Sequence, residues 1–168
     1  MKVLLFNDRK DYDPTLPRHV RYSANSIITA DEKIAMIYVA KHNFYAFPGG
    51  GVDDGETIIN ALIRETAEEA GLIIKPSSII EFGKTVEIRK DRKVDGIYER
   101  HDHFYLCDVE DKSVKQRLSE NEIEYGHQFV YVSIDEAITV NEAHIRQGYN
   151  WTEGIICVLN HLKNKNNK

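Results

Sequence analysis

A run of three glycines, Gly49 to Gly51, most constrains the fold, because it stands between a short β-rich segment and a long amphipathic one. Tyr45 to Phe47 has the composition of a short strand, which Pro48 and the glycines cannot continue. Thr57 to Ala70 has apolar residues at helical spacing and strong helix formers, and Gly71 provides a stop. The sequence therefore predicts a strand, a glycine-rich loop and a helix in immediate succession.

Acidic residues follow the glycines, which is unusual for a loop of this kind. Glycine-rich loops that open a helix usually bind phosphate through backbone N–H groups and the positive end of the helix. Here Asp53, Asp54 and Glu56 follow, and the helix entry reads GETI where a P-loop NTPase has Gly-Lys-Ser or Gly-Lys-Thr. A P-loop NTPase is therefore disfavoured. We expect Asp53 and Asp54 to be solvated turn residues.

Three carboxylates lie on one shoulder of the predicted helix. At about 100° per residue, Glu65, Glu68 and Glu69 fall beside the apolar stripe rather than opposite it. Carboxylates three or four residues apart repel each other, so the group requires a cation or full solvation. Oxygen ligands without Cys or His favour Mg²⁺ or Mn²⁺, and the adjacent glycine loop favours this metal site over a solvated acidic face. The centre of the predicted stripe is Ile59, Ile63, Thr66 and Ala70, extended by Ile58 and Leu62.

The segment GGVDDGETIINALIRETAEEAGL, Gly50 to Leu72, resembles the signature of the Nudix hydrolases, G-x5-E-x7-R-E-U-x-E-E-x-G-U, where U is a bulky aliphatic residue. Thr66 at a U position is the one departure; it is β-branched and of similar volume, so it bears on packing more than on chemistry. The signature covers 23 of 168 residues. The matching positions are Gly50, Glu56, Arg64, Glu65, Glu68, Glu69, Gly71 and Leu72.

This resemblance implies a single Nudix domain over residues 1–168, of the α/β class, folded as a Nudix-type α/β/α sandwich with a mixed β-sheet. It implies a magnesium-dependent hydrolase that cleaves a pyrophosphate bond in a nucleoside diphosphate linked to another moiety. A modified nucleoside triphosphate, ADP-ribose or another nucleotide sugar, and a dinucleoside polyphosphate all fit. The alternative is a non-catalytic Nudix domain that binds or senses a nucleotide, which the complete set of signature glutamates disfavours.

The resemblance also assigns roles to individual residues. Glu65, Glu68 and Glu69 would be metal ligands or proton acceptors, and the carbonyl of Gly49 a further ligand. Arg64 would orient the glutamates through ion pairs. Glu56 would support the junction of loop and helix. An auxiliary base could come from the acidic stretch Glu110 to Glu124, which we expect to be an overhanging loop; its candidates are Glu122 and Glu124.

Candidates for substrate binding lie on the strands before the signature. Arg21, with Arg18, could contact phosphate or ribose, since cations are needed in an acidic chain. Tyr45 and Phe47 could flank a base, although aromatic residues of a short strand more often pack in the core. The role of Trp151 is open between packing and stacking. His101 and His103 share one face of a strand, but without a third ligand nearby they are interpreted as polar strand residues rather than a metal site.

Sequential strands around one helix predict the mixed α/β sandwich independently of the signature. The predicted strands are Val20 to Thr29, Ile34 to Ala40, Ile79 to Arg89, His101 to Val109 and Gln128 to Ile134, the first two forming a hairpin or near-hairpin. The segment IDEAI predicts the start of a short helix, Trp151 to Leu162 predicts a C-terminal helix, and residues 163–168 are expected to fray.

The composition of the chain limits the kinds of binding partner that we expect. The chain is 42% hydrophobic and 29% charged with a net charge of -5, which argues against stable binding to nucleic acid and leaves a small nucleotide as the expected partner. No membrane-spanning run or signal sequence is present, so we expect a cytoplasmic protein that binds no membrane. A homodimer is left open. Cys107 and Cys157 lack metal-ligand spacing and are expected to be free thiols.

Overall fold

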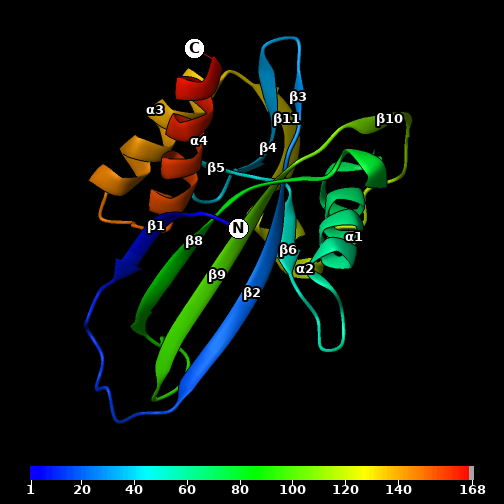
Figure 1. The fold of residues 1–168 in the computed structure, drawn as a ribbon. Helices are drawn as coiled ribbons and strands as arrows, with labels where there is room; N and C mark the ends of the chain where they lie inside the picture. The colour runs from blue at the N-terminus through cyan, green and yellow to red at the C-terminus, as the bar shows by residue number, and fades with distance from the viewer. Residues whose placement is uncertain (167–168) are drawn as a thin grey trace.

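The computed structural model describes residues 1–166, and in it two larger β-sheets lie between helices on either side, with a two-stranded ribbon apart from them (Figure 1). The largest sheet is mixed: β1 is parallel to β8 and β9 is parallel to β2, whereas the pairs β8 with β9 and β2 with β6 are antiparallel. Its order is β1 (Val3–Asp8), β8 (Ile80–Lys90), β9 (Ile97–Leu106), β2 (Arg18–Ile27) and β6 (Gly49–Gly51).

A second sheet has β4 at its centre. It runs in the order β11 (His127–Val132), β4 (Lys33–Val39) and β3 (Thr29–Ala30), and β5 (Phe44–Ala46) also pairs with β4. All its pairs are antiparallel. A separate two-stranded ribbon joins β7 (Leu72–Ile74) to β10 (Val109–Ser113).

Helices cover both faces of these sheets. α1 (Ile58–Ala70) lies on one side, and α3 (Ile134–Arg146) and α4 (Glu153–Asn166) lie on the other; α2 (Glu120–Tyr125) is a short helix before β11 (Figure 1). A 3₁₀ turn spans Pro76–Ser78. The predicted α/β/α sandwich with a mixed sheet is therefore confirmed. Within residues 1–166, every helix is too short or too polar to span a membrane.

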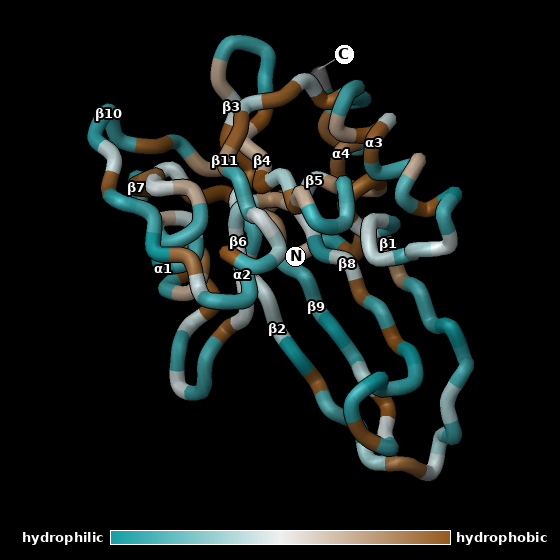
Figure 2. Tube along the Cα trace, turned by 180° about the vertical axis from the view of Figure 1, so that it is seen from behind, coloured by the Kyte–Doolittle hydropathy of each residue, from teal (hydrophilic) through white to brown (hydrophobic). Residues whose placement is uncertain are grey.

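Two large apolar clusters lie between the layers, and consecutive residues of the chain contribute to both. Ile27 packs in the core beneath α3 and α4, whereas Ile28 packs in the core beneath α1. β4 divides its side chains in the same way, with Met36 in the first core and Ala35 in the second. This explains the nearly continuous apolar run of β4, since both of its faces are covered. Hydrophobic segments accordingly gather around β4, β11, α3 and α4, while the far ends of β2 and β9 are largely hydrophilic (Figure 2).

The signature helix α1 has the boundaries that its sequence predicts. The Thr57 side chain accepts a hydrogen bond of 3.2 Å from the Asn60 N–H, and Gly71 ends the helix in the left-handed conformation with φ 70°. The face against the sheets keeps Leu62, Thr66 and Ala70 of the predicted stripe, but it is shifted around the helix. Ile59, expected at the centre of the stripe, is 36% exposed, and Glu69 is buried within the contact face.

Buried Thr66 explains the departure from the aliphatic signature. Its hydroxyl donates to Ser26 Oγ at 3.0 Å, and the Ser26 hydroxyl in turn donates to the Pro48 carbonyl at 3.1 Å. A hydroxyl in this position is fully used, so its burial does not leave a polar group unsatisfied. These two hydrogen bonds link α1 to β2 and to Pro48, the residue just before the glycines.

Several sequence expectations about strands and loops are wrong. The glycine run is strand β6 rather than a loop, because Gly49–Gly51 pairs with Ser23, Ala24 and Asn25 of β2. The hairpin is formed by β3 and β4 alone, since β2 lies in the other sheet. β9 spans Ile97 to Leu106, so it begins and ends earlier than the strand predicted from His101 to Val109.

The acidic stretch and the C-terminus also differ from expectation. Glu110 to Glu124 is not one loop, because it contains most of β10 and the start of α2. α3 has 13 residues where only a short helix is expected. Helix α4 continues through Asn166, so residues 163–166 are helical; residues 167 and 168 lie outside the described part. Strands β1 and β7 are not predicted from the sequence.

Candidate active site

Each glycine of β6 permits a different close approach. A Cβ on Gly49 would lie 2.2 Å from the Ala24 carbonyl oxygen, and one on Gly51 would lie 2.3 Å from Nη2 of Arg21. At Gly50 a Cβ would lie 2.4 Å from the carboxyl carbon of Glu65. Such distances exclude any side chain unless a neighbour moves. The three glycines therefore fit β6 between β2 and the carboxylate face of α1.

Arg64 binds the carboxylates of the signature. Its guanidinium makes a bidentate contact with Glu56, with Nε to Oε1 at 2.9 Å and Nη2 to Oε2 at 2.8 Å. Nη1 donates to Glu65 Oε1 at 2.7 Å and to Glu68 Oε2 at 3.3 Å. Nη2 also donates to the Gly51 carbonyl at 3.1 Å. One arginine thus fixes the loop before α1 and two glutamates of the helix.

The pKa values of Glu56 and Glu65 are shifted in opposite directions, because the two carboxylates differ in burial and in their contacts with Arg64. The hydrogen bonds from Arg64 lower the pKa of Glu56 to about 2. Burial raises the pKa of Glu65, and it outweighs the ion pair with Arg64, which acts in the opposite direction. The pKa of Arg64 is raised mainly by its hydrogen bonds to Glu56.

Glu69 is the most deeply buried of the signature glutamates, with 6% of its surface exposed. Its Oε2 accepts a hydrogen bond of 2.9 Å from the Gly49 N–H, and its Oε1 lies 3.4 Å from Nδ1 of His127. Burial is the main cause of its raised pKa, and these two partners counteract it. Gln116 donates a hydrogen bond to the backbone carbonyl of Glu69, so the segment after β10 lies against the end of α1.

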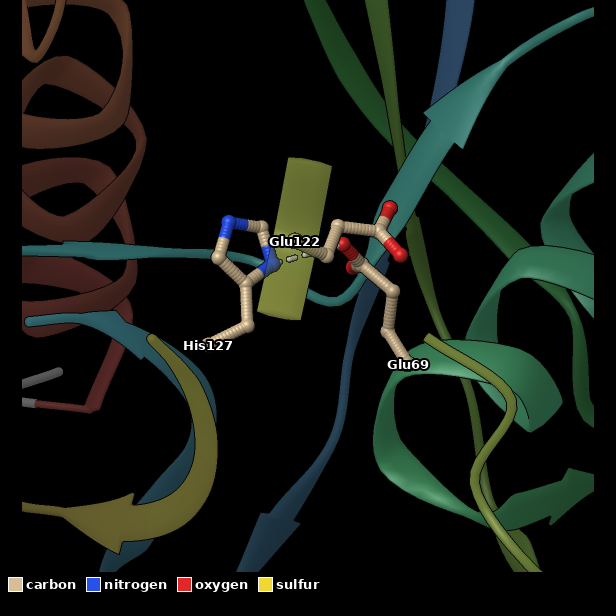
Figure 3. Close-up of side chains that lie close together, drawn as sticks. All are labelled: Glu69, Glu122 and His127. Atoms are coloured by element: carbon tan, nitrogen blue, oxygen red, sulfur yellow. Dashed lines mark ion pairs between the residues drawn. The ribbon is translucent and has the colours of Figure 1, made fainter. Parts of the chain in front are cut away.

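Glu69, Glu122 and His127 converge on one point (Figure 3). Each offers a ligand atom, and these atoms all lie within 4.8 Å of one another. Among residues 1–166 this is the one group of three or more such side chains that could hold a metal ion. It is not the trio that the sequence predicts, because Arg64 engages the carboxylates of Glu65 and Glu68.

The two candidates for an auxiliary base have different surroundings. Glu122 lies in the cluster and also closes a capping box by accepting from the Ser119 N–H at 2.7 Å. Glu124 is 63% exposed and pairs with Lys41 instead. Lys41 holds it on the outer surface, outside the group formed by Glu69, Glu122 and His127. His127 has no sequence signal of its own; the pairing of β11 with β4 brings it to Glu69.

A cavity of about 320 Å³ adjoins this cluster. Polar side chains of β2 and β9 line one part of it, and Phe44 and Trp151 line another. Arg21 lines the cavity as expected. Phe47 borders it but is only 3% exposed and packs edge-on against Phe104, so it is mainly a core residue. Tyr45 is not among the lining residues: its hydroxyl donates to Glu136 at 3.2 Å, which directs it towards α3.

A family model described as the NUDIX domain matches residues 19–152. The chain belongs to the Nudix family. This assignment confirms the resemblance carried by Gly50 to Leu72.

Individual Nudix relatives agree with the family assignment. The chain is 38% identical over 82 residues to the ADP-ribose pyrophosphatase of Methanocaldococcus jannaschii, a match that covers 47% of each chain. The chain spans about half or less of the length of the curated relatives it matches.

A Nudix hydrolase structure from Nitrosomonas europaea is 18% identical, with a TM-score of 0.60 and coverage of 88% of this chain and 91% of that one. The E. coli ORF135 structure is 22% identical, with a TM-score of 0.57 and coverage of 85% and 88%. At these identities the two structures support the fold.

The remaining polar candidates lie outside the Nudix cleft. Arg18 pairs with Glu99 and lines neither the cleft nor the cluster. His101 and His103 have nearly parallel rings with centroids 6.5 Å apart, and Nε2 of His101 lies 2.6 Å from Glu99 Oε1. Both residues lie in strand β9.

The donor set of this Nudix site fits a divalent cation. Glu69 and Glu122 bring carboxylate oxygens to the cluster, and hard cations prefer such ligands. The Nδ1 atom of His127 is buried without a hydrogen-bond partner, although it lies beside Glu69. A buried polar atom without a partner, next to a buried carboxylate, is the arrangement that a bound cation or its water would satisfy.

Proposed function

We propose that this protein is a Nudix pyrophosphohydrolase that cleaves the pyrophosphate bond of a nucleoside diphosphate linked to another moiety. The observation that carries the proposal is the placement of Glu69. Its buried carboxylate is held by the Gly49 N–H at the edge of the cavity, beside Glu122 and His127. A carboxylate with a raised pKa in a cleft is typical of a functional site.

The metal proposed for this site is Mg²⁺, with Mn²⁺ as a substitute. Glu65, Glu68, Glu69 and the Gly49 carbonyl are the proposed ligands. When bound, the ion would supply charge neutralisation of the diphosphate and lower the pKa of a coordinated water. The guanidinium of Arg64 orients Glu65 and Glu68 through its two Nη1 contacts. Those carboxylates therefore have fixed positions before a substrate arrives.

Proton transfer is assigned to the carboxylates of the cluster. Glu122 is the proposed acceptor of the proton from the attacking water, since it reaches the cluster from α2, outside the signature helix. Glu122 is less buried than Glu69. His127 lies 3.4 Å from the Glu69 carboxylate and limits the positions that this carboxylate can take.

The cavity supports a sugar-linked nucleotide as the first substrate to test. Arg21 offers a cation next to Gly51, where it can meet phosphate. Deeper along β2 and β9, Asp102 accepts hydrogen bonds from Ser23 and from Nε of Arg100, the latter at 2.6 Å, and all three side chains line the cavity. Carboxylate and hydroxyl groups of this kind suit the hydroxyls of a sugar better than a third phosphate. ADP-ribose combines both features, and it is the substrate named for the M. jannaschii relative.

The test is hydrolysis of ADP-ribose, a modified nucleoside triphosphate and a dinucleoside polyphosphate by the purified protein, each with Mg²⁺ and with EDTA. We expect Mg²⁺-dependent release of AMP and ribose 5-phosphate from ADP-ribose. Reaction in ¹⁸O-labelled water identifies the phosphorus that is attacked. Binding of ADP-ribose without hydrolysis of any compound would instead support a nucleotide-sensing domain, and neither binding nor hydrolysis would refute the proposal.

A further inference from the structure

Arg9, directly after β1, links separate segments of the chain. Its Nε donates to Glu87 Oε1 on β8 at 2.9 Å, and its Nη2 donates to Glu153 Oε2 at the start of α4, also at 2.9 Å. With the Asn150 amide oxygen facing Arg9, this oxygen accepts from Nη1 at 2.8 Å. The side chain is 20% exposed, so these contacts are partly shielded from water. One guanidinium therefore ties β8 to α4 and to the loop before it.

The partners of Arg9 form part of the cleft wall. Glu87, Asn150 and Glu153 all line the cavity, whereas Arg9 lies behind them. Asn7 also lines it and donates to Glu153 Oε2 at 2.7 Å. The contacts of Arg9 thus determine where cavity-lining groups stand, although Arg9 itself does not border the cavity.

The loop of residues 147–152, between α3 and α4, carries this wall. At its far end the Thr152 hydroxyl donates to the Asn141 carbonyl at 3.0 Å. Within residues 1–166, Arg9 is the one hydrogen-bond partner found for the side chain of Asn150. The neighbouring Trp151 is 41% exposed and meets His42 and Phe44 edge-on, at interplanar angles of 85° and 76°. His144 and Tyr149 also contact the indole, with ring centroids at 5.5 and 5.3 Å, so aromatic contacts position the exposed Trp151 side chain.

We propose that Arg9 is a positioning residue of the active site, which holds the loop of residues 147–152 against β8 so that Asn150 and Trp151 complete the cleft wall. This inference rests on the proposed function for its effect on substrate. Arg9 contacts neither the cluster of Glu69, Glu122 and His127 nor the signature residues. It therefore affects substrate binding through the cavity-lining residues that it holds. A multidentate arginine holds geometry better than a lysine, which cannot reach three partners in fixed directions.

The experiment compares Arg9→Gln with the wild-type protein. We expect the KM for ADP-ribose with Mg²⁺ to rise about 10-fold while kcat changes less than about 2-fold, because uniform binding is lost and the chemical step is kept. Trp151 is the only tryptophan in the chain, so its fluorescence reports on the loop alone. We expect a red-shifted emission and stronger acrylamide quenching in the absence of substrate. Arg9→Lys should be intermediate, and it replaces Arg9→Gln if that variant does not fold.

Arg146→Gln is the matched control. Arg146 precedes the same loop on α3, but its ion pair is with Glu142 at 3.7 Å, one turn earlier in that helix. Unchanged KM and emission in Arg9→Gln would overturn the proposal, as would equal changes in Arg146→Gln or a fall in kcat with KM unchanged. If the wild-type protein hydrolyses nothing, the proposed function fails, whereas the fluorescence comparison still tests whether Arg9 positions the loop.

Discussion

The Glu69 carboxylate accepts a hydrogen bond of 2.9 Å from the backbone N–H of Gly49, which joins the signature helix directly to the glycine strand. Its other oxygen faces His127 of β11. A single side chain therefore connects α1 to both large sheets. The arrangement carries a cost, since a buried carboxylate without a full complement of partners is destabilising when charged.

Replacing Glu69 should separate activity from stability. Glu69→Gln keeps an acceptor for the Gly49 N–H but removes the charge, so we expect kcat to fall about 10²-fold to 10⁴-fold. The folded-state pKa of Glu69 lies above its ordinary value, so its ionised form destabilises the fold at neutral pH. The variant should therefore melt at a higher temperature than wild type at pH 7. Turnover near the wild-type rate would refute the role of Glu69.

Alanine substitutions at the adjacent residues Gly49 and Gly50 should have different effects on stability and activity. Gly50→Ala places a methyl group against the Glu65 carboxylate, a flexible group that can move, so we expect a folded protein with activity reduced about 10²-fold by its displacement. Gly49→Ala instead meets the Ala24 backbone carbonyl, which cannot yield without bending β2, and should destabilise the fold by about 1–3 kcal/mol. Urea denaturation and turnover distinguish the two. Equal destabilisation by both substitutions would contradict this assignment.

Glu122 and Glu124 form a natural matched pair on α2. Glu122→Gln removes a carboxylate from the cluster, and kcat should fall about 10²-fold if Glu122 accepts the proton. Glu124→Gln breaks only the exposed contact with Lys41 and should leave kcat unchanged. Steady-state kinetics of both variants with Mg²⁺ are the measurement. Similar activities for the two variants would assign the base to the signature helix.

The signature predicted only those features of the site that depend on residues a few positions apart. Its caps, glycines and glutamates are set by positions a few residues apart, so α1 and the partners of Arg64 follow from the sequence. His127 does not, because 58 residues separate it from Glu69 and only the pairing of β11 with β4 brings them together. The exposure of Ile59 has a related cause: the burial of Glu69 turns the helix away from the face that apolar spacing alone selects.

The same distinction applies to the fold. Most strands were predicted from the sequence, because runs of β-branched residues are a local signal. The pairing of the strands was not predicted, since β2 pairs in parallel with the distant strand β9 and leaves the expected hairpin to β3. The glycine run could not be recognised as a strand, because glycine has no strand propensity. Its place as β6 depends on β2, which offers backbone partners from Ser23 to Asn25.

Thr66→Val tests the explanation for the signature departure. The substitution keeps the shape but removes the donor to Ser26 Oγ, so the free energy of unfolding should fall by about 1 kcal/mol. Activity should be retained, because the hydroxyl lies in the core and not in the cleft. Urea denaturation of the two proteins measures the difference. A variant as stable as wild type would show that the hydroxyl chain has no net effect.

Glu56 should contribute to stability in a defined pH window. Arg64 lowers its pKa from the ordinary 4.5 to about 2, so folding favours the charged form. A lowered folded-state pKa stabilises the protein above the unfolded-state value, and this stabilisation is lost as pH falls through the folded-state value. Wild type should therefore be more stable than Glu56→Gln at pH 6, with a difference that shrinks between pH 4.5 and about 2. Asp54→Asn, at an exposed position in the same turn, is the control. A pH-independent difference between wild type and Glu56→Gln would exclude the ion pair with Arg64 as its cause.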